Sequence, residues 1–70
     1  MIPLTYADTN EINVIKKVTG KPEVKKHLED MGFVTGAIVK VVSTVNGSLI
    51  VNIKDTKVAL DKELAMKIMI

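Results

Sequence analysis

The one histidine of this 70-residue chain lies among carboxylates at helical spacing. Glu23 precedes His27 by four residues and Asp30 follows it by three, so in a helix the three side chains can share one face. One imidazole and two carboxylates could hold a divalent transition metal weakly. A tight iron site would need a second imidazole or a thiolate, and the chain has neither. An exposed helical histidine with acidic neighbours is therefore the simpler interpretation, and we expect no tightly bound metal.

No residue pattern for catalysis is present. The chain has no cysteine to act as a nucleophile, and no motif fixes a Ser or Asp partner for His27. The four glycines, Gly20, Gly32, Gly36 and Gly47, lack the spacing of a phosphate-binding loop and indicate turns. We therefore expect a protein that is not an enzyme and has no cofactor.

Composition indicates one small aliphatic domain spanning residues 1–70. Apolar residues make up 47% of the chain, mostly Val, Ile, Leu and Met, and β-branched side chains pack well in strands. All ten basic residues are lysines and the net charge is only +2. The absence of arginine and the scarcity of aromatic residues argue against nucleic-acid binding.

The chain carries no sequence signal for export or membrane insertion. Its N-terminus has no basic segment followed by a long apolar run. The longest apolar runs are broken by Lys40, Asn52 and Lys67, well short of the ~20 residues that a membrane span requires. Together with the absence of cysteine, these features predict a cytoplasmic protein.

A strand and a helix are expected in the first half of the chain. Residues 12–18 read as a strand that ends at Gly20, and residues 22–31 read as a helix with Pro22 in its first turn. Within that helix Val24, Leu28 and Met31 form one apolar stripe. Gly32 suits the left-handed position that closes a helix, and Phe33 is expected to pack just beyond it. Before the strand, three residues are expected to cover one end of the core: Leu4, Tyr6 and Ile12.

Residues 37–44 and 48–54 read as a hairpin whose register can be argued. A two-residue Asn46-Gly47 loop would bring Lys40 onto the apolar face. A three-residue loop, with Gly47 left-handed, pairs Val41 with Val51 and Val39 with Ile53. It also places Ser43 beside Leu49 and turns Lys40, Asn52 and Lys54 outward. Because a slip of one residue exchanges the two faces, the second register is favoured.

The rest of the chain predicts two more strands around a helical turn. Residues 57–60 read as a strand, Asp61 as a helix N-cap, residues 62–67 as a helical turn and residues 68–70 as a closing strand. Five short strands separated by turn signals predict a mainly β protein, a small barrel with one α-helix. The residues expected in its core are Val24, Leu28, Val39, Val41, Leu49, Val51 and Ile53.

Three segments together carry a family resemblance. They are the turn Leu-Glu-Asp-Met-Gly-Phe-Val-Thr-Gly over residues 28–36, the valine strand Val-Lys-Val-Val over residues 39–42, and the C-terminal set Val-Ala-Leu, Glu-Leu-Ala and Ile-Met-Ile. This ordered set resembles the FeoA family of small cytosolic accessory domains of ferrous-iron transport. The resemblance implies a stand-alone SH3-like barrel that binds and regulates an FeoB-type membrane transporter.

The chain departs from the family pattern at three positions. Asn10-Glu11 stands where the family usually has Gly-Glu, and asparagine tolerates the left-handed conformation that such a turn needs. His27 and Asp61 stand where basic residues are common. If those basic residues contact a partner, this chain's contact is altered.

The residues themselves offer two candidate surfaces for a protein partner. The register above turns Ile38, Val42 and Ile50 away from the core, with Val42 opposite Ile50. We call this surface the hairpin face, and its residues are Ile38, Lys40, Val42, Ile50, Asn52 and Lys54. The alternative lies on the helix and the turn after it, with Lys25, Lys26, His27 and Phe33.

A protein interface needs a desolvated apolar centre, which favours the hairpin face. The resemblance to the FeoA family makes protein binding in ferrous-iron uptake the preferred function. The alternatives are a weak transition-metal sensor built on Glu23, His27 and Asp30, and a small-barrel nucleic-acid binder. Weak self-association is left open.

Overall fold

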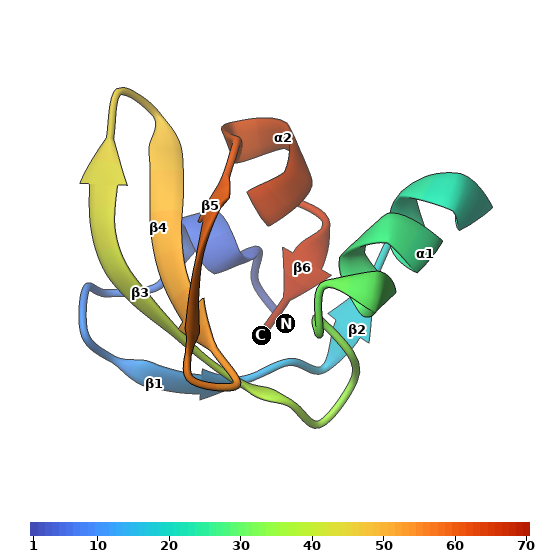
Figure 1. The fold of residues 1–70 in the computed structure, drawn as a ribbon, viewed down its shortest axis with the longest axis horizontal. Coiled ribbons are helices and arrows are strands. Elements are labelled where there is room, and N and C mark those ends of the chain that lie inside the picture. The colour runs from blue at the N-terminus through green and yellow to red at the C-terminus, as the bar shows by residue number, and fades with distance from the viewer.

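The computed structural model describes residues 1–70 and contains six strands, two α-helices and one 3-10 turn (Figure 1). In chain order the elements are η1 (Leu4–Tyr6), β1 (Ile12–Val14), β2 (Lys17–Val18), α1 (Pro22–Asp30), β3 (Ile38–Val45), β4 (Ser48–Ile53), β5 (Thr56–Leu60), α2 (Lys62–Ala65) and β6 (Ile68–Met69). The mainly β class predicted from the sequence is confirmed, with one helix of nine residues and one short helix.

The strands form two antiparallel sheets. The larger sheet has the order β1-β3-β4-β5, and the smaller one pairs β2 with β6. The N-terminus joins the smaller sheet, because Ile2 N–H donates to Ile70 O at 3.0 Å and Ile70 N–H donates to Ile2 O at 2.8 Å. The two sheets do not close into one continuous barrel.

The strand expected over residues 12–18 is divided in two. Ile15 N–H donates to Ala37 O at 2.9 Å, whereas the next amide, that of Lys16, donates to Met69 O at 2.8 Å. The chain therefore leaves β3 and joins β6 within one residue, with the Ile15 side chain fully buried at the corner. This division gives six strands rather than the five expected.

The predicted register of the central hairpin is confirmed, but its predicted loop is wrong. Val41 faces Val51 and Val39 faces Ile53, whereas Val45 pairs with Ser48 across a two-residue loop. Asn46 and Gly47 in that loop have φ of 49° and 85°, as a type I′ turn requires. A β-bulge between Val41 and Ser43 reconciles loop and register by adding one residue to β3.

The bulge also corrects two expected neighbours. Ser43 faces Ile50, not Leu49, and Thr44 takes the position opposite Leu49. Val42 is the extra residue of the bulge, so it has no direct partner and does not face Ile50.

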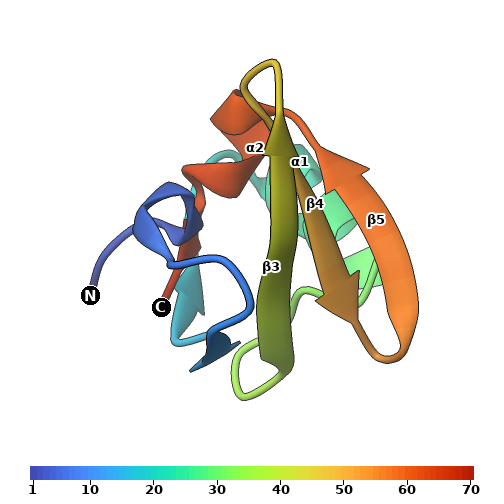
Figure 2. The same cartoon turned by 90° about the vertical axis from the view of Figure 1, so that its left-hand side faces the viewer.

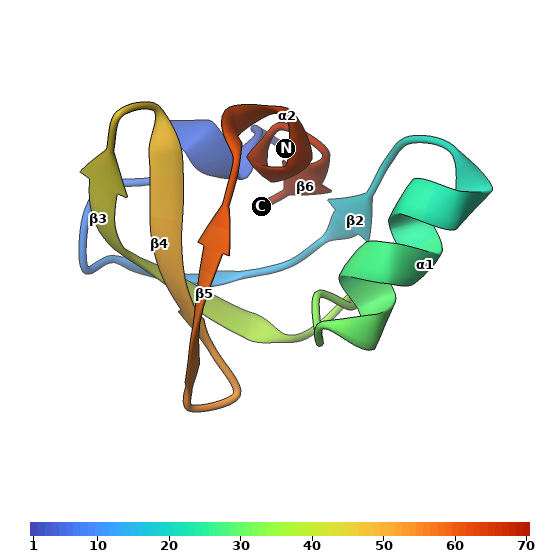
Figure 3. The same cartoon turned by 45° about the horizontal axis from the view of Figure 1, so that its top comes forward.

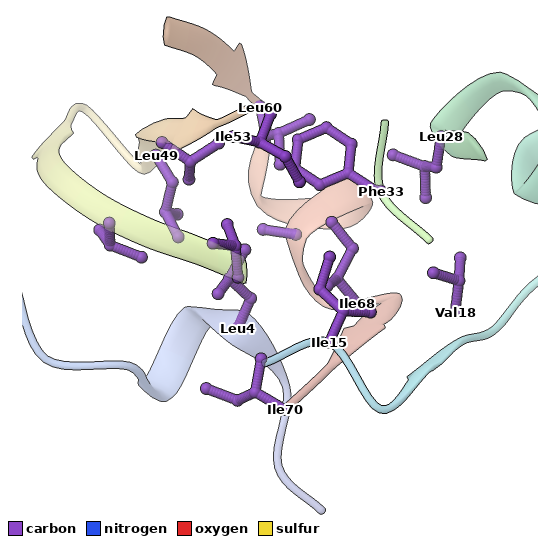
Figure 4. Packing of buried hydrophobic residues seen from close by; sticks show 14 residues of the cluster. Leu4, Ile15, Val18, Leu28, Phe33, Leu49, Ile53, Leu60, Ile68 and Ile70 are labelled. Atoms are coloured by element: carbon purple, nitrogen blue, oxygen red, sulfur yellow. The ribbon is translucent and has the colours of Figure 1, made fainter. Parts of the chain in front are cut away.

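Fourteen buried apolar side chains form one core between the sheets and α2 (Figure 4). They are Leu4, Ile15, Val18, Leu28, Phe33, Val39, Val41, Leu49, Val51, Ile53, Leu60, Ala65, Ile68 and Ile70. Six of the seven expected core residues are among them, and the seventh, Val24, is half-buried against the cluster. Leu4 is buried as expected.

Tyr6 and Ile12 do not cover the core. Tyr6 is 70% exposed and Ile12 is 68% exposed. The 3-10 turn of η1 directs Leu4 inward and leaves Tyr6 outside. Ile12 lies opposite Lys40, on the outer surface of the larger sheet.

Helix α1 begins with Pro22 in its first turn and ends in a Schellman motif. Phe33 N–H donates to Leu28 O and Gly32 N–H donates to Glu29 O, both at 2.9 Å, while Gly32 has φ of 102°. Leu28 and Phe33 are both fully buried. The motif thus ties the C-terminal end of α1 to the core, while the rest of the helix projects from the molecule (Figures 1 and 3).

Helix α2 follows the N-cap predicted at Asp61, whose Oδ1 accepts from Leu64 N–H at 2.8 Å. The helix ends at Ala65, and residues 66–67 continue as a turn. Neither α-helix has the length and apolar character needed to cross a membrane.

Candidate protein-docking surface

The hairpin face lies on the outer side of the larger sheet, on β3, β4 and the turn after β4. Figure 2 looks onto this part of the sheet from the side of β3. Ile38 is 61% exposed, and Lys40 sits directly opposite Asn52. Val42, Ile50 and Asn52 are half-buried, and Lys54 is exposed in the β4–β5 turn.

Strand β1 extends this face with two apolar residues that sequence reasoning missed. Val14 is opposite Ile38 and Ile12 is opposite Lys40. Ile12 is 68% exposed and Val14 is 49% exposed. We call Ile12, Val14 and Ile38 the β1–β3 apolar patch. The alternation of Ile12 and Val14 was a usable signal, because residues two apart in a strand lie on one face.

An open depression of about 310 Å³ lies at the edge of this patch. Its lining residues are Ile12, Ile38, Lys40, Asn52, Lys54 and Asp55. Four of them belong to the hairpin face proposed from the sequence. The depression combines two isoleucines with two lysines, one aspartate and one asparagine, which suits an amphipathic protein segment with a negative charge.

The alternative surface lies on α1, which projects on the side of the molecule away from β3 (Figure 1), although Lys54 of the hairpin face lies beside Gly32 in the turn after the helix. Lys26 and His27 are exposed and Lys25 is half-buried. Phe33 is fully buried in the core and therefore offers no surface to a partner. A smaller hollow of about 190 Å³ near α1 is lined by Lys17, Val18, Lys25, Glu29, Phe33, Val34 and Thr35. This region is dominated by charge and has no exposed apolar centre.

The residues considered for a metal do not form a site. Glu23, His27 and Asp30 are exposed on α1. Nowhere in the chain do three or more His, Cys, Asp or Glu side chains gather in a way that could hold a metal ion.

The three turn glycines have the backbone geometry expected of them. The φ angles of Gly32, Gly36 and Gly47 are 102°, 91° and 85°. Asn10 likewise has φ of 67°, so the left-handed turn survives without glycine.

Comparison with known proteins places this arrangement in a family. The model of the FeoA domain matches residues 2–70. The chain belongs to the FeoA family. A curated FeoA relative from Methanocaldococcus jannaschii, named "Putative Fe(2+) transport protein A", is 34% identical over 70 residues, which cover the whole of this chain and 85% of that protein.

Solved FeoA structures share the fold. A crystal structure of an iron uptake regulatory protein, FeoA, superposes with a TM-score of 0.88 at 24% identity, covering 97% of this chain and 90% of that one. The zinc complex of Stenotrophomonas maltophilia FeoA, described as an SH3 domain protein, gives a TM-score of 0.85 at 21% identity, covering 99% and 88%. The predicted SH3-like fold is confirmed.

Proposed function

We propose that this FeoA-family chain is an accessory protein of ferrous-iron uptake that acts in the cytoplasm by binding an FeoB-type membrane transporter. Family membership and the name of the Methanocaldococcus jannaschii relative support the link to ferrous iron. The chain has no cysteine and no group of three or more His, Cys, Asp or Glu side chains that could hold a metal ion. Its role is therefore proposed to be binding rather than catalysis.

The observation that carries the proposal is the exposed apolar patch beside the hairpin face. Protein interfaces combine a desolvated apolar centre with a polar rim, and the centre supplies most of the binding energy. Ile12, Val14 and Ile38 are 68%, 49% and 61% exposed and adjacent in the sheet. The lysines around them supply the rim. A nucleic-acid surface would instead present clustered basic groups without this apolar centre.

A matched pair of substitutions on β3 tests the docking surface. Ile38→Asp places a charge in the apolar patch, whereas Val45→Asp places the same charge on the same strand at a site 53% exposed but outside the hairpin face. We expect Ile38→Asp to weaken binding to the purified transporter at least about tenfold, and Val45→Asp to change it less than about twofold. Binding is measured by biolayer interferometry, and circular dichroism checks that both variants are folded.

A double variant on α1 decides between the two candidate surfaces. Lys25→Glu combined with Lys26→Glu reverses charge on α1, on the side of the molecule away from β3. We expect only a modest, salt-dependent loss of binding, as for charges outside an interface centre. If this double variant abolishes binding while Ile38→Asp does not, the docking surface is on α1. If the unsubstituted chain does not bind the transporter, the proposed function is wrong.

A further inference from the structure

Strand β1 has one edge without a partner. It is the first strand of the sheet order β1-β3-β4-β5, and it pairs only with β3. Asn13 lies opposite Val39, and Ile15 N–H bonds to Ala37 O. Because alternate residues of an antiparallel strand bond to the same neighbour, Asn13 and Ile15 point their backbone groups at β3. The N–H and C=O groups of Ile12 and Val14 therefore point away from the sheet.

The same two residues expose their side chains. Ile12 and Val14 thus present unpaired backbone groups at the sheet edge and apolar surface on the outer face. We propose that an extended segment of the protein partner adds to this edge as a further strand of the larger sheet. This inference rests on the proposed function and specifies how the partner is held.

The surroundings of the edge define the chemistry of that segment. A strand added beside β1 would have every second side chain on the outer face, next to Ile12 and Val14. Lys40 lies opposite Ile12, about two strand spacings of 4.8 Å from the added strand. That distance is within the combined reach of a lysine and a glutamate side chain. The segment is therefore an extended one with alternating apolar residues and one carboxylate on the outer face.

The other edge strand of the larger sheet, β5, is less suited to this role. Lys57 and Ala59 on β5 are exposed, and Lys57 lies opposite Asn52 at the outer surface. Charged residues on an edge strand discourage pairing with another chain. The three residues of β1 include neither a charged residue nor a proline.

A second copy of this chain is a less suitable occupant than a different protein. The β1 strands of two copies could pair in antiparallel fashion about a two-fold axis at Asn13. Such pairing would join the two larger sheets edge to edge and place nothing over their outer faces. It would leave the depression lined by Ile38, Lys40 and Asn52 open in both copies. The contact of two three-residue strands also falls well below the roughly 1,200 Å² of a stable interface. A different partner can pair with β1 and cover the depression together.

Proline substitutions test the backbone pairing directly. Val14→Pro removes an N–H that faces away from β3, a position where an edge strand tolerates proline. We expect it to weaken transporter binding at least about tenfold more than Val14→Ala, since the hydrogen bond from this N–H to the partner is lost and the proline ring obstructs the approach of the added strand. Ala59→Pro, at the edge of β5, is the matched control and should leave binding unchanged. Equal losses for Val14→Pro and Val14→Ala would overturn strand addition in favour of side-chain contact alone.

Amide hydrogen exchange of the unsubstituted chain provides a test that does not depend on how the variants fold. Saturation with the transporter should slow exchange at Ile12 and Val14 by at least about tenfold. Binding without this protection would contradict the inference. Protection that grows with protein concentration in the absence of the transporter would show self-pairing, which also contradicts it.

A synthetic peptide separates failure of this inference from failure of the proposed function. The capped peptide Val-Thr-Val-Thr-Glu places two valines and the carboxylate on one face of a strand. If the transporter does not bind but the peptide protects the amides of Ile12 and Val14, the proposed function fails and the strand-accepting edge stands. If millimolar peptide leaves both amides unprotected and the transporter does not bind, both are wrong.

Discussion

At the scale of single residues, the β4–β5 turn contains a local conflict between sequence and backbone. Lys54 and Asp55 have φ of 50° and 61°. The left-handed region is unfavourable for residues other than glycine, and Asp tolerates it only in part. The Asn46-Gly47 turn one hairpin earlier meets the same geometric demand with favourable residues. The β4–β5 turn is therefore a place where the native chain carries avoidable strain.

The variant Asp55→Gly should relieve this strain. We expect the free energy of unfolding to rise by about 0.5–1 kcal/mol, because glycine's relief of the positive φ exceeds its entropic cost in the unfolded chain. Urea denaturation followed by circular dichroism measures the change. Asp61→Gly is the control: it removes the same charge at φ −71° and loses the cap to Leu64 N–H, so it should lower stability by a few tenths of a kcal/mol. A drop in stability for Asp55→Gly would contradict the argument.

Alternation along the hairpin strands allowed the buried residues to be predicted, because one face of a strand must enter the core. Val39, Val41 and Val51 follow this rule. The same alternation could not predict the exposure of Tyr6 and Ile12, because their exposure depends on where η1 and β1 lie relative to the rest of the chain. The candidate docking surface was predicted in part for the same reason. Ile38 and Lys40 follow from the hairpin, whereas Ile12 and Val14 require the pairing of β1 with β3.

At the scale of elements, the bulge in β3 shows why loop and register could not both be derived from the sequence. The Asn46-Gly47 dipeptide favours a two-residue loop, and the apolar pattern favours Val41 opposite Val51. In a regular ladder these two preferences exclude each other. The structure satisfies both by inserting Val42 as a bulge. A bulge adds twist and bend to a strand, and no residue type in this segment specifies it.

The confirmed register makes a prediction about the central hairpin. Val51 is fully buried, whereas Val45 on the neighbouring strand is 53% exposed. Truncating Val51 to Ala removes two buried methyl groups and leaves a small cavity, so we expect a loss of about 1–3 kcal/mol in unfolding free energy. Val45→Ala should cost less than about 0.5 kcal/mol. Similar effects from the two truncations, measured by urea denaturation, would mean that the inner face of β4 is not packed as the structure has it.

At the scale of the whole molecule, the chain consists of a packed β body and a projecting helix. Helix α1 has nine residues, of which only Leu28 is buried. A helix of this length is marginal in isolation, so its order depends on the apolar anchor at its C-terminal end. Strand β3 and the projecting helix α1 lie on opposite sides of the molecule (Figure 1), although Lys54 of the hairpin face lies beside Gly32 in the turn after the helix. A partner at the hairpin face would therefore leave α1 free to open independently.

Native-state hydrogen exchange should resolve these two parts of the molecule. We expect the amides of Lys26 and His27 in α1 to exchange at least about tenfold faster than the amide of Val51, after correction for intrinsic rates, because α1 can open without exposing the core. Exchange at Lys26 and His27 should also depend only weakly on added urea, since local opening exposes little new surface. Val51 should instead follow the urea dependence of global unfolding. Equal protection and equal urea dependence at all three amides would show that α1 unfolds together with the β body, and that its few buried contacts suffice to couple the two.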